Sequence, residues 1–319
     1  MVVITLTIPG RLLSVSPYSQ SKGPLSYMRS ANGSRNPPTS SPPPFPTWGK
    51  GAGGIGVFQY IITPMTKQAD LTAYLFEGAP AHARGLAAEL LGWMDASARF
   101  TGFVETYRDK IRKKIRVTRE VEGVLDLRGE LVIARCLLAD RRLAVAYEPY
   151  ASTGRRGPDF AVTYRANLVF NIEVARIRAD APDGAAELSD AKELERKALR
   201  VERILLDKLG QMQPGMPNLL VIHTRAGLAQ AIDLAGLMQA VKTRVESKDP
   251  AFFAATRYDS PAAFYKDFLL LSGILLWGGN LWVNKQARPG MDEKVIRLVG
   301  GLEDPYPPNP LPPSSGRGR

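Results

Sequence analysis

The stretch RRGPDFAVTYRANLVFNIEVARIR, residues 155–178, contains two β-strand patterns separated by a two-residue turn. DFAVTY, residues 159–164, and NLVFNIEVARI, residues 167–177, are rich in β-branched and aromatic residues. Asp159 follows Pro158 at the start of the first pattern, and Glu173 stands near the end of the second. A hairpin would place these two carboxylates side by side, and carboxylate oxygens are the ligands that hard divalent cations prefer. The stretch therefore predicts an antiparallel hairpin with a candidate metal site.

The residues before this hairpin add a strand and a helix. RLAVAYEPY, residues 142–150, predicts one more strand and so a three-stranded antiparallel meander. Residues 122–139 have the period of an amphipathic helix, with Leu127, Leu131, Ala134 and Leu138 on the inward stripe. Glu130 lies beside that stripe, and two interpretations stay open: a half-buried salt-bridge partner or a site carboxylate.

The residues after the hairpin alternate between helix and strand. A long amphipathic helix is expected over 189–211, with Ser189 as its N-cap, and it is followed by the apolar strand NLLVIHT, residues 218–224. Such a fully apolar strand suits a sheet that is covered on both faces. Helices over 228–246 and 261–270 and a hairpin of 272–277 with 280–284 complete the expected fold, which belongs to the α/β class.

The order helix, three strands, helix, strand, together with Pro158-Asp159 and Glu173-Val174, resembles the PD-(D/E)XK nuclease-like superfamily. The resemblance covers residues 122–224 and implies a restriction-endonuclease-like core. The N-terminal helices and the C-terminal helix and hairpin would be additions to it. It further implies a metal-dependent nuclease, a hydrolase of phosphodiester bonds, in which Glu130 matches the acidic residue of the first core helix.

The implied chemistry requires Mg²⁺ or Mn²⁺, which would orient the phosphate, acidify a water and neutralise negative charge on the phosphoryl oxygens. Asp159 and Glu173 would be direct ligands of the metal, and the carbonyl of Val174 would add a backbone oxygen. Glu130 would bind a second ion or its water. The two adjacent carboxylates would have raised pKa values in the absence of a cation.

One residue departs from the family pattern. Ala175 stands where the lysine of the motif is expected, and alanine can neither position a water nor stabilise a transition state. Arg176 is one candidate replacement, although side chains alternate across a strand and it should point to the opposite face unless a β-bulge re-aims it. A lysine of the following helix, Lys192 or Lys197, is another.

A purely structural interpretation of the same residues also stays open. Asp159 would then cap the turn into its strand, and Glu173 would pair with Arg176, Arg178 or a cation of the helix. The fold could therefore be that of a nuclease without cleavage activity.

A basic face is predicted upstream of this core. Residues 83–99 and 101–119 have helical periods, and the outer face of the second helix is rich in cations. It is either a solvated helix face or a surface for nucleic-acid phosphates. The candidate phosphate-binding residues are Arg108, Lys110, Arg112, Lys113, Lys114 and Arg116, followed by Arg119.

Composition restricts the remaining function classes. The net charge of +11 favours a polyanionic partner, and we predict DNA rather than RNA. With only two histidines, zinc sites rich in histidine and Ser-His-Asp catalysis are disfavoured. No apolar run reaches the roughly 18 to 20 residues of a membrane span. The single cysteine, Cys136, has no intrachain disulfide partner, and a cytoplasmic location is the expectation.

Both ends of the chain differ in composition from the centre. Residues 1–64 contain ten prolines, eight glycines and no acidic residue, which predicts a disordered segment. Met65 is a candidate true start, and the glycine run at 49–56 is interpreted as low complexity. We expect an N-terminal helical region over 65–121, the nuclease-like core over 122–224, an extension over 225–302 and a disordered tail over 303–319.

Three function hypotheses follow from these patterns. The first is a metal-dependent nuclease, and the second is an inactive nuclease-fold module that binds nucleic acid through the basic face. The third is an interaction protein that uses apolar surface around Phe252, Phe253, Trp277 and Trp282, with a homodimer as one form of this interaction. Aromatic residues in such positions more often belong to a core.

Overall fold

The computed structural model describes residues 66–151, 157–165, 167–178, 190–224 and 226–302. All of them lie in one compact unit, Met65–Arg319. The predictions for residues 1–64, for the tail and for Ser189 as an N-cap fall outside the described residues.

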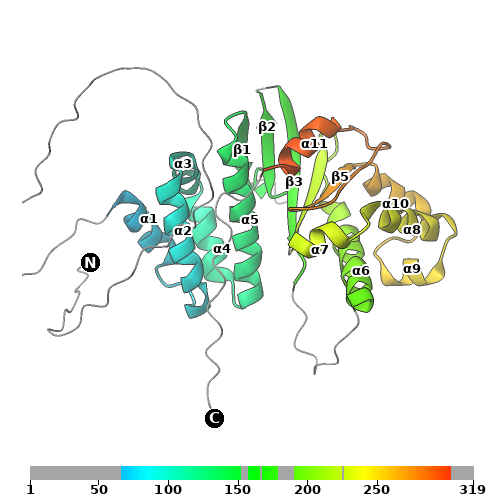
Figure 1. Cartoon of the computed structure of the whole chain (residues 1–319), viewed down its shortest axis with the longest axis horizontal. Coiled ribbons are helices and arrows are strands. Elements are labelled where there is room, and N and C mark those ends of the chain that lie inside the picture. Colours follow the sequence, from blue (N-terminus) through cyan, green and yellow to red (C-terminus); the bar gives the residue numbers. More distant parts are fainter. Residues whose placement is uncertain (1–65, 152–156, 166, 179–189, 225, 303–319) are drawn as a thin grey trace, which may run out of the picture. The chain divides into compact units, whose positions relative to one another are not determined.

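A six-stranded mixed sheet forms the centre of this α/β unit, with the strands in the order β1-β2-β3-β4-β5-β6 (Figure 1). β1, β2 and β3 form the predicted antiparallel meander, and β4 and β5 continue the sheet in parallel to β3. β6 is antiparallel to β5 and confirms the predicted closing hairpin. The strands are β1 Leu143–Tyr147, β2 Phe160–Tyr164, β3 Leu168–Arg176, β4 Asn218–His223, β5 Leu271–Leu276 and β6 Leu281–Val283.

Both faces of the sheet are covered, as the apolar composition of β4 predicts. Leu219 and Val221 belong to one hydrophobic core, whereas Leu220 and Ile222 belong to a second core on the other face. The alternation of side chains along a strand explains this division. β4 is therefore hydrophobic at every position from Leu219 to Ile222 because each face meets a layer of helices.

The first core contains the N-terminal helices and α5, which packs along β1 and β3. Leu127, Leu131, Ala134 and Leu138 of α5 are buried, as predicted. The helices of this layer are α1 Lys67–Phe76, α2 Arg84–Ala96, α3 Ala98–Thr106, α4 Arg108–Val117, α5 Val121–Ala139 and α11 Glu293–Gly300.

The second core lies against the other face of the sheet. Val201, Leu205 and Leu209 of α6 and the adjoining turn are buried there with Phe264 and Phe268 of α10. The helices of this layer are α6 Asp190–Lys208, α7 Ala226–Ala231, α8 Leu234–Glu246, α9 Pro250–Ala255 and α10 Pro261–Phe268.

Two of the helices predicted as continuous are broken in the structure, so these predictions were wrong. The helix expected over 101–119 ends at Thr106 and restarts at Arg108, with the Tyr107 ring packed against Phe103 and Tyr147 at the break. The helix expected over 228–246 is interrupted because the Asp233 carboxylate accepts hydrogen bonds from two backbone N–H groups and starts α8 as an N-cap.

The lengths of β2 and β3 differ in a way that shapes one end of the sheet. Phe160, the first residue of β2, pairs with Ile172, whereas β3 continues through Arg176 beside β4. Pro158 precedes Asp159 and has no backbone N–H with which to extend the ladder. The last four residues of β3 consequently have a neighbouring strand on one side only.

Within the described residues, no helix is long and apolar enough to cross a membrane. Cys136 is buried in α5, where burial raises the pKa of its thiol to about 11. A thiol with this pKa is unreactive at neutral pH.

Candidate functional site

Asp159 marks the point where β2 begins and the free edge of β3 is exposed. Its Oδ2 accepts a hydrogen bond of 2.8 Å from the backbone N–H of Val174. The side chain thus takes the place of the missing ladder partner opposite β3, which gives Asp159 a structural role. One carboxylate oxygen, Oδ1, has no such role in the ladder.

Glu173 is the most deeply buried acid of the site, with 2% of its surface exposed. Its Oε1 lies 2.5 Å from Nζ of Lys208, which comes from the last turn of α6. Its Oε2 is buried and has no hydrogen-bond partner. A buried carboxylate oxygen without a partner costs free energy, so Glu173 retains a capacity to bind a further donor or a cation.

Glu130 approaches from α5 and is held by two groups. Its Oε2 accepts hydrogen bonds from Nζ of Lys114 at 2.7 Å and from the hydroxyl of Tyr147 at 2.6 Å. Lys114 also pairs with Glu148 at 2.9 Å. Glu148 has a left-handed backbone with φ of 45°, which is strained for a residue with a side chain. Both interpretations of Glu130 are consistent with this position, because it is an ion-pair partner that also lines the pocket.

The protonation of these groups reflects their proximity. Burial raises the pKa of Asp159 well above its ordinary value, and the negative charges of Glu130 and Glu173 raise it further. Burial also raises the pKa of Glu173, against the opposing effect of Lys208. Burial alone would lower the pKa of Lys114, but Glu130 and Asp159 outweigh it and the pKa is raised. The three carboxylates therefore form one electrostatically coupled group.

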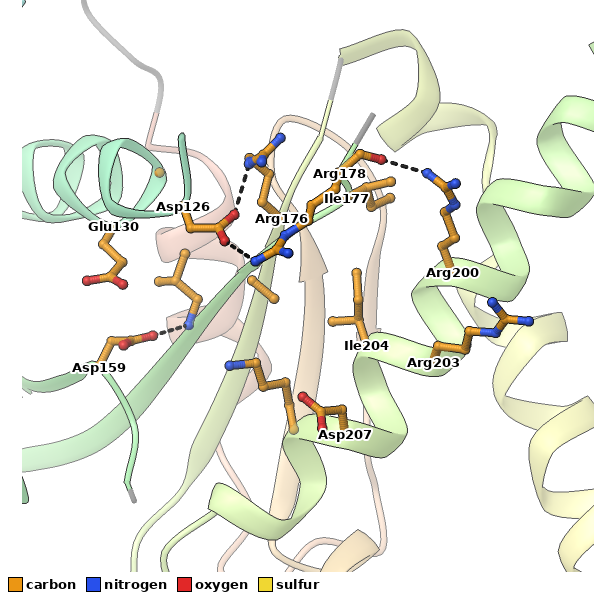
Figure 2. A pocket seen from close by; sticks show the side chains of 14 residues that line it. Asp126, Glu130, Asp159, Arg176, Ile177, Arg178, Arg200, Arg203, Ile204 and Asp207 are labelled. Atoms are coloured by element: carbon orange, nitrogen blue, oxygen red, sulfur yellow. Dashed lines mark hydrogen bonds and ion pairs between the residues drawn. The ribbon is translucent and has the colours of Figure 1, made fainter. Parts of the chain in front are cut away.

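A pocket of about 550 Å³ opens beside this group, between α5 and α6 at the free edge of β3. Figure 2 shows Glu130 and Asp159 next to each other on one side of it, and Arg200 and Arg203 on α6 on the other. The backbone of Val174 to Arg178 lines the pocket between them. The α5 and β2 side of the pocket thus contains Asp126, Glu130 and Asp159, whereas the α6 side contains three basic residues, Arg200, Arg203 and Lys208, and one acid, Asp207.

Ala175 and Arg176 lie on opposite faces of β3, as strand alternation predicts. Ala175 lines the pocket and packs with the core on the α6 side. Arg176 points toward α5, where it pairs with Asp126 at 3.1 Å (Figure 2). It also pairs with Glu122 of the same helix. No β-bulge re-aims Arg176 toward Glu173, because the β3 register against β4 is regular from Asn171 to Arg176. Arg176 therefore lines the pocket but is held by two carboxylates of α5, away from Glu173, and its role as a catalytic residue stays a prediction.

The predicted lysine from the following helix is present, but at a different position. Lys192 and Lys197 lie 16 and 11 residues before Lys208 on α6, about 24 and 16 Å along the helix axis. Only the last turn of α6 reaches Glu173, since the chain leaves β3 through a long connection before the helix begins. A lysine of this helix does pair with Glu173, but it is Lys208 and neither Lys192 nor Lys197, and its catalytic role stays a prediction.

The predicted basic face divides into two parts. Arg112 and Arg116 both hold Glu77 at the end of α1, and Arg108 and Arg112 lie over the ring of Tyr74. Lys110, Lys113 and Lys114 instead line a second pocket with the end of β1. The face is therefore not one continuous surface for phosphates.

The aromatic residues proposed as an interaction surface belong to the cores. Phe252 and Trp277 are buried, and Phe253 and Trp282 pack against the second core. That part of the prediction was wrong, because Phe252, Phe253 and Trp282 pack in or against the second core and Trp277 is buried in the first core. A homodimer through another surface stays a prediction.

The donor set can be tested against a divalent cation. Among the described residues, no group of three or more His, Cys, Asp and Glu side chains is placed to hold a metal ion. The unpartnered Oε2 of Glu173 and the mutual repulsion of the three carboxylates nevertheless fit a cation. Asp159 and Glu173 are the residues that would hold it, as two hard oxygen ligands with open positions left for water or phosphate.

Comparisons with known proteins add nothing to this geometry. No family model, curated protein or solved structure matches this chain. The site has to be interpreted from its own residues.

Two features of the pocket were not predicted, although each has a visible signal in the sequence. Glu122, Asp126 and Glu130 recur every four residues and form an acidic stripe on α5 that faces the end of β3. Arg200, Ile204 and Lys208 have the same spacing on α6 and line the opposite wall. Each pattern is a helix face, and only the position of the free strand edge shows that both faces point into one pocket.

Proposed function

We propose that this chain is a PD-(D/E)XK nuclease-like protein that hydrolyses phosphodiester bonds of nucleic acid with Mg²⁺ or Mn²⁺. The observation that carries the proposal is the meeting of Lys208 with Glu173 beside Asp159 and Glu130. Glu130, Asp159 and Glu173 come from one helix and two adjacent strands in the chain order that the resemblance implies, and Lys208 comes from the following helix in place of a lysine at position 175. A restriction-endonuclease-like core over residues 122–224 is part of the same proposal.

Each group has a distinct task in this account. Asp159 and Glu173 hold the divalent cation, which supplies charge neutralisation and a more acidic water. Lys208 supplies the cation that the family carries two residues after the glutamate, and it stabilises negative charge on the phosphoryl oxygens. Glu130 accepts a hydrogen bond from a water, and Lys114 holds Glu130 in place.

The α6 wall of the pocket supports a phosphodiester as substrate. Arg200 and Arg203 line it, and Arg203 forms no ion pair with any of the described residues. Guanidinium groups suit phosphate because their N–H donors match its oxygens in pairs. The net charge of +11 adds long-range attraction for a polyanion.

The test is cleavage of labelled single- and double-stranded DNA and RNA in the presence of Mg²⁺ or Mn²⁺. Asp159→Asn and Glu173→Gln are expected to lower the rate at least about a hundredfold, since each removes a ligand charge while keeping shape. Asp95→Asn is the matched control, because Asp95 is an exposed residue of α2 outside the pocket. Activity that survives both site substitutions would refute the proposal.

A second candidate function is supported by the lysines of the site. Lys114 and Lys208 already neutralise two of the three carboxylates, and Ala175 removes the lysine of the motif. The chain would then be a catalytically inactive module that binds nucleic acid. Binding without cleavage in any of the metal conditions above would favour this alternative.

A further inference from the structure

A second pocket lies directly behind the carboxylates and has a different character. It has a volume of about 660 Å³ and lies between α4 and the end of β1. Three lysines line it, Lys110, Lys113 and Lys114, against the single carboxylate of Glu148. The pocket is therefore a cationic groove, in contrast to the mixed charges of the pocket beside β3.

The lysines of this groove are not equivalent. Lys114 is committed to Glu130 and Glu148 by two ion pairs. Lys110 Nζ donates to the backbone carbonyls of Tyr147 and Glu148 at 3.0 and 2.9 Å, so its position is fixed while no carboxylate neutralises it. Lys113 is exposed and has no ion pair within the described part of the chain. The groove thus offers to an anion one ammonium group anchored by backbone carbonyls and one that is exposed.

Apolar and aromatic surface adjoins these charges. The half-buried ring of Tyr107 lines the groove, and Val117, which is 64% exposed, lies at its side. Tyr107 is supported from behind by Phe103 and Tyr147, with ring centroids 5.0 and 5.8 Å away. A supported ring beside ammonium groups is the combination that binds an unpaired nucleotide, because the base stacks while the phosphates meet the cations.

One hydrogen-bond network separates the groove from the carboxylate pocket. Glu130 lines the pocket beside β3, and Lys114 and Tyr147, both lining the groove, donate to its Oε2. A nucleotide that lies in the groove would therefore contact residues that hold Glu130 in the neighbouring pocket. Arg108, Arg112 and Arg116 lie on the α1 side of α4 and would not touch it.

We propose that the groove of Tyr107, Lys110 and Lys113 binds a single-stranded segment of nucleic acid and leads it to the carboxylate pocket. The inference rests on the proposed function for the substrate class, but it concerns binding and not cleavage. In this proposal, only one side of α4 binds nucleic acid, and not the whole basic face that the sequence predicts. It also favours a single strand over a duplex, because stacking on Tyr107 requires an unpaired base.

The test is the affinity of a short labelled single-stranded oligonucleotide, measured by fluorescence anisotropy in EDTA so that no cleavage occurs. Lys113→Glu is expected to weaken binding about tenfold at low salt and to reduce the salt dependence, since it removes a phosphate contact and adds repulsion. Arg108→Glu is the matched control, because it makes the same charge change on the same helix outside the groove. It is expected to change the affinity less than about twofold.

Tyr107→Leu tests the stacking part and is expected to weaken binding about tenfold, with the melting temperature recorded to exclude a folding defect. Equal losses for Lys113→Glu and Arg108→Glu would overturn the groove, as would an absence of binding by the unsubstituted chain. Tighter binding of a matched duplex would overturn the single-strand assignment. Binding is measured without metal and cleavage with it, so a failure of the groove is distinguishable from a failure of the proposed catalysis.

Discussion

The basic residues on the two faces of β3 differ in their ion-pair partners. On the α5 side, Arg176 forms ion pairs with two carboxylates, Glu122 and Asp126, which neutralise its charge within the fold. On the α6 side, Lys208 meets Glu173, whose second oxygen has no partner. Arg176, next to the motif position, is thus held by carboxylates of α5, whereas Lys208, 33 positions after Ala175, reaches Glu173.

The difference follows from geometry that sequence proximity does not reveal. Neighbouring residues of a strand point to opposite faces, so Arg176 cannot join Glu173. A helix packed against the strand can join it, provided that the right turn of the helix lies alongside. A missing residue of a site should therefore be sought on the element facing the site before it is sought in adjacent positions.

The largest expected effect separates the two basic residues by activity. Lys208→Met should lower metal-dependent cleavage about a hundredfold to a thousandfold, because it removes a cation that stabilises developing charge. Arg176→Met should change the rate only a few-fold, since its partners lie on the α5 side. The measurement is the single-turnover cleavage rate of both purified variants. An equal loss of rate in the two variants would contradict the different roles of Lys208 and Arg176.

The next effect concerns stability. Lys208→Met should lower the free energy of unfolding by about 3 kcal/mol, because it leaves the buried carboxylate of Glu173 without its cation. Glu173→Gln combined with Lys208→Met should recover most of that loss. Urea unfolding of the two single variants and the double variant gives the coupling energy. Additive changes would show that Lys208 and Glu173 are not a pair.

A smaller effect is expected from the cation. Mg²⁺ or Mn²⁺ at about ten times its dissociation constant should stabilise the unsubstituted chain by about 1.4 kcal/mol, which raises the melting temperature by a few degrees. Asp159→Asn should abolish this shift while keeping an acceptor for the Val174 N–H. Thermal unfolding with and without the metal measures it, and an unchanged shift in Asp159→Asn would remove Asp159 from the ligand set.

The smallest effect is the pH dependence of Asp159. Its pKa is raised in the folded state by burial and by Glu130 and Glu173, so the folded state binds the proton more tightly than the unfolded state does. Stability from this group is then present at low pH and is lost as the pH rises from the unfolded pKa, about 3.9, toward the folded one. At neutral pH without metal, Asp159→Asn should be at least as stable as the unsubstituted chain.

That advantage should shrink by at most about 1.4 kcal/mol per pH unit as the pH falls through the same window. Unfolding curves of the two proteins at several pH values provide the measurement. An advantage of Asp159→Asn that grows toward acid pH would contradict the raised pKa.

The meander and the apolar β4 strand were predictable because each follows from a short-range pattern. Alternation fixed the hairpin of β2 and β3, and the continuous apolar run of β4 indicated two covered faces. The break at Tyr107 was not predictable from periodicity, since the apolar spacing continues through it. Helix breaks of this kind depend on tertiary packing of the ring at the break.

The site was predictable in its carboxylates and not in its cations. Asp159 and Glu173 are adjacent because a hairpin makes them so. Lys114 and Lys208 reach them from α4 and α6, whose placement against the sheet depends on how both cores pack. Sequence patterns specify which face of a helix is buried, but not which turn of it lies beside a given strand residue.

The central claim is that Lys208 performs the task of the lysine absent at position 175. The most direct measurement compares metal-dependent cleavage rates of the unsubstituted chain, Lys208→Met, and Lys208→Met combined with Ala175→Lys. Ala175 lines the same pocket as Lys208, so a lysine there would restore the cation from the strand. The account predicts loss in the single variant and recovery of at least about tenfold in the double variant. A full rate in Lys208→Met would contradict it.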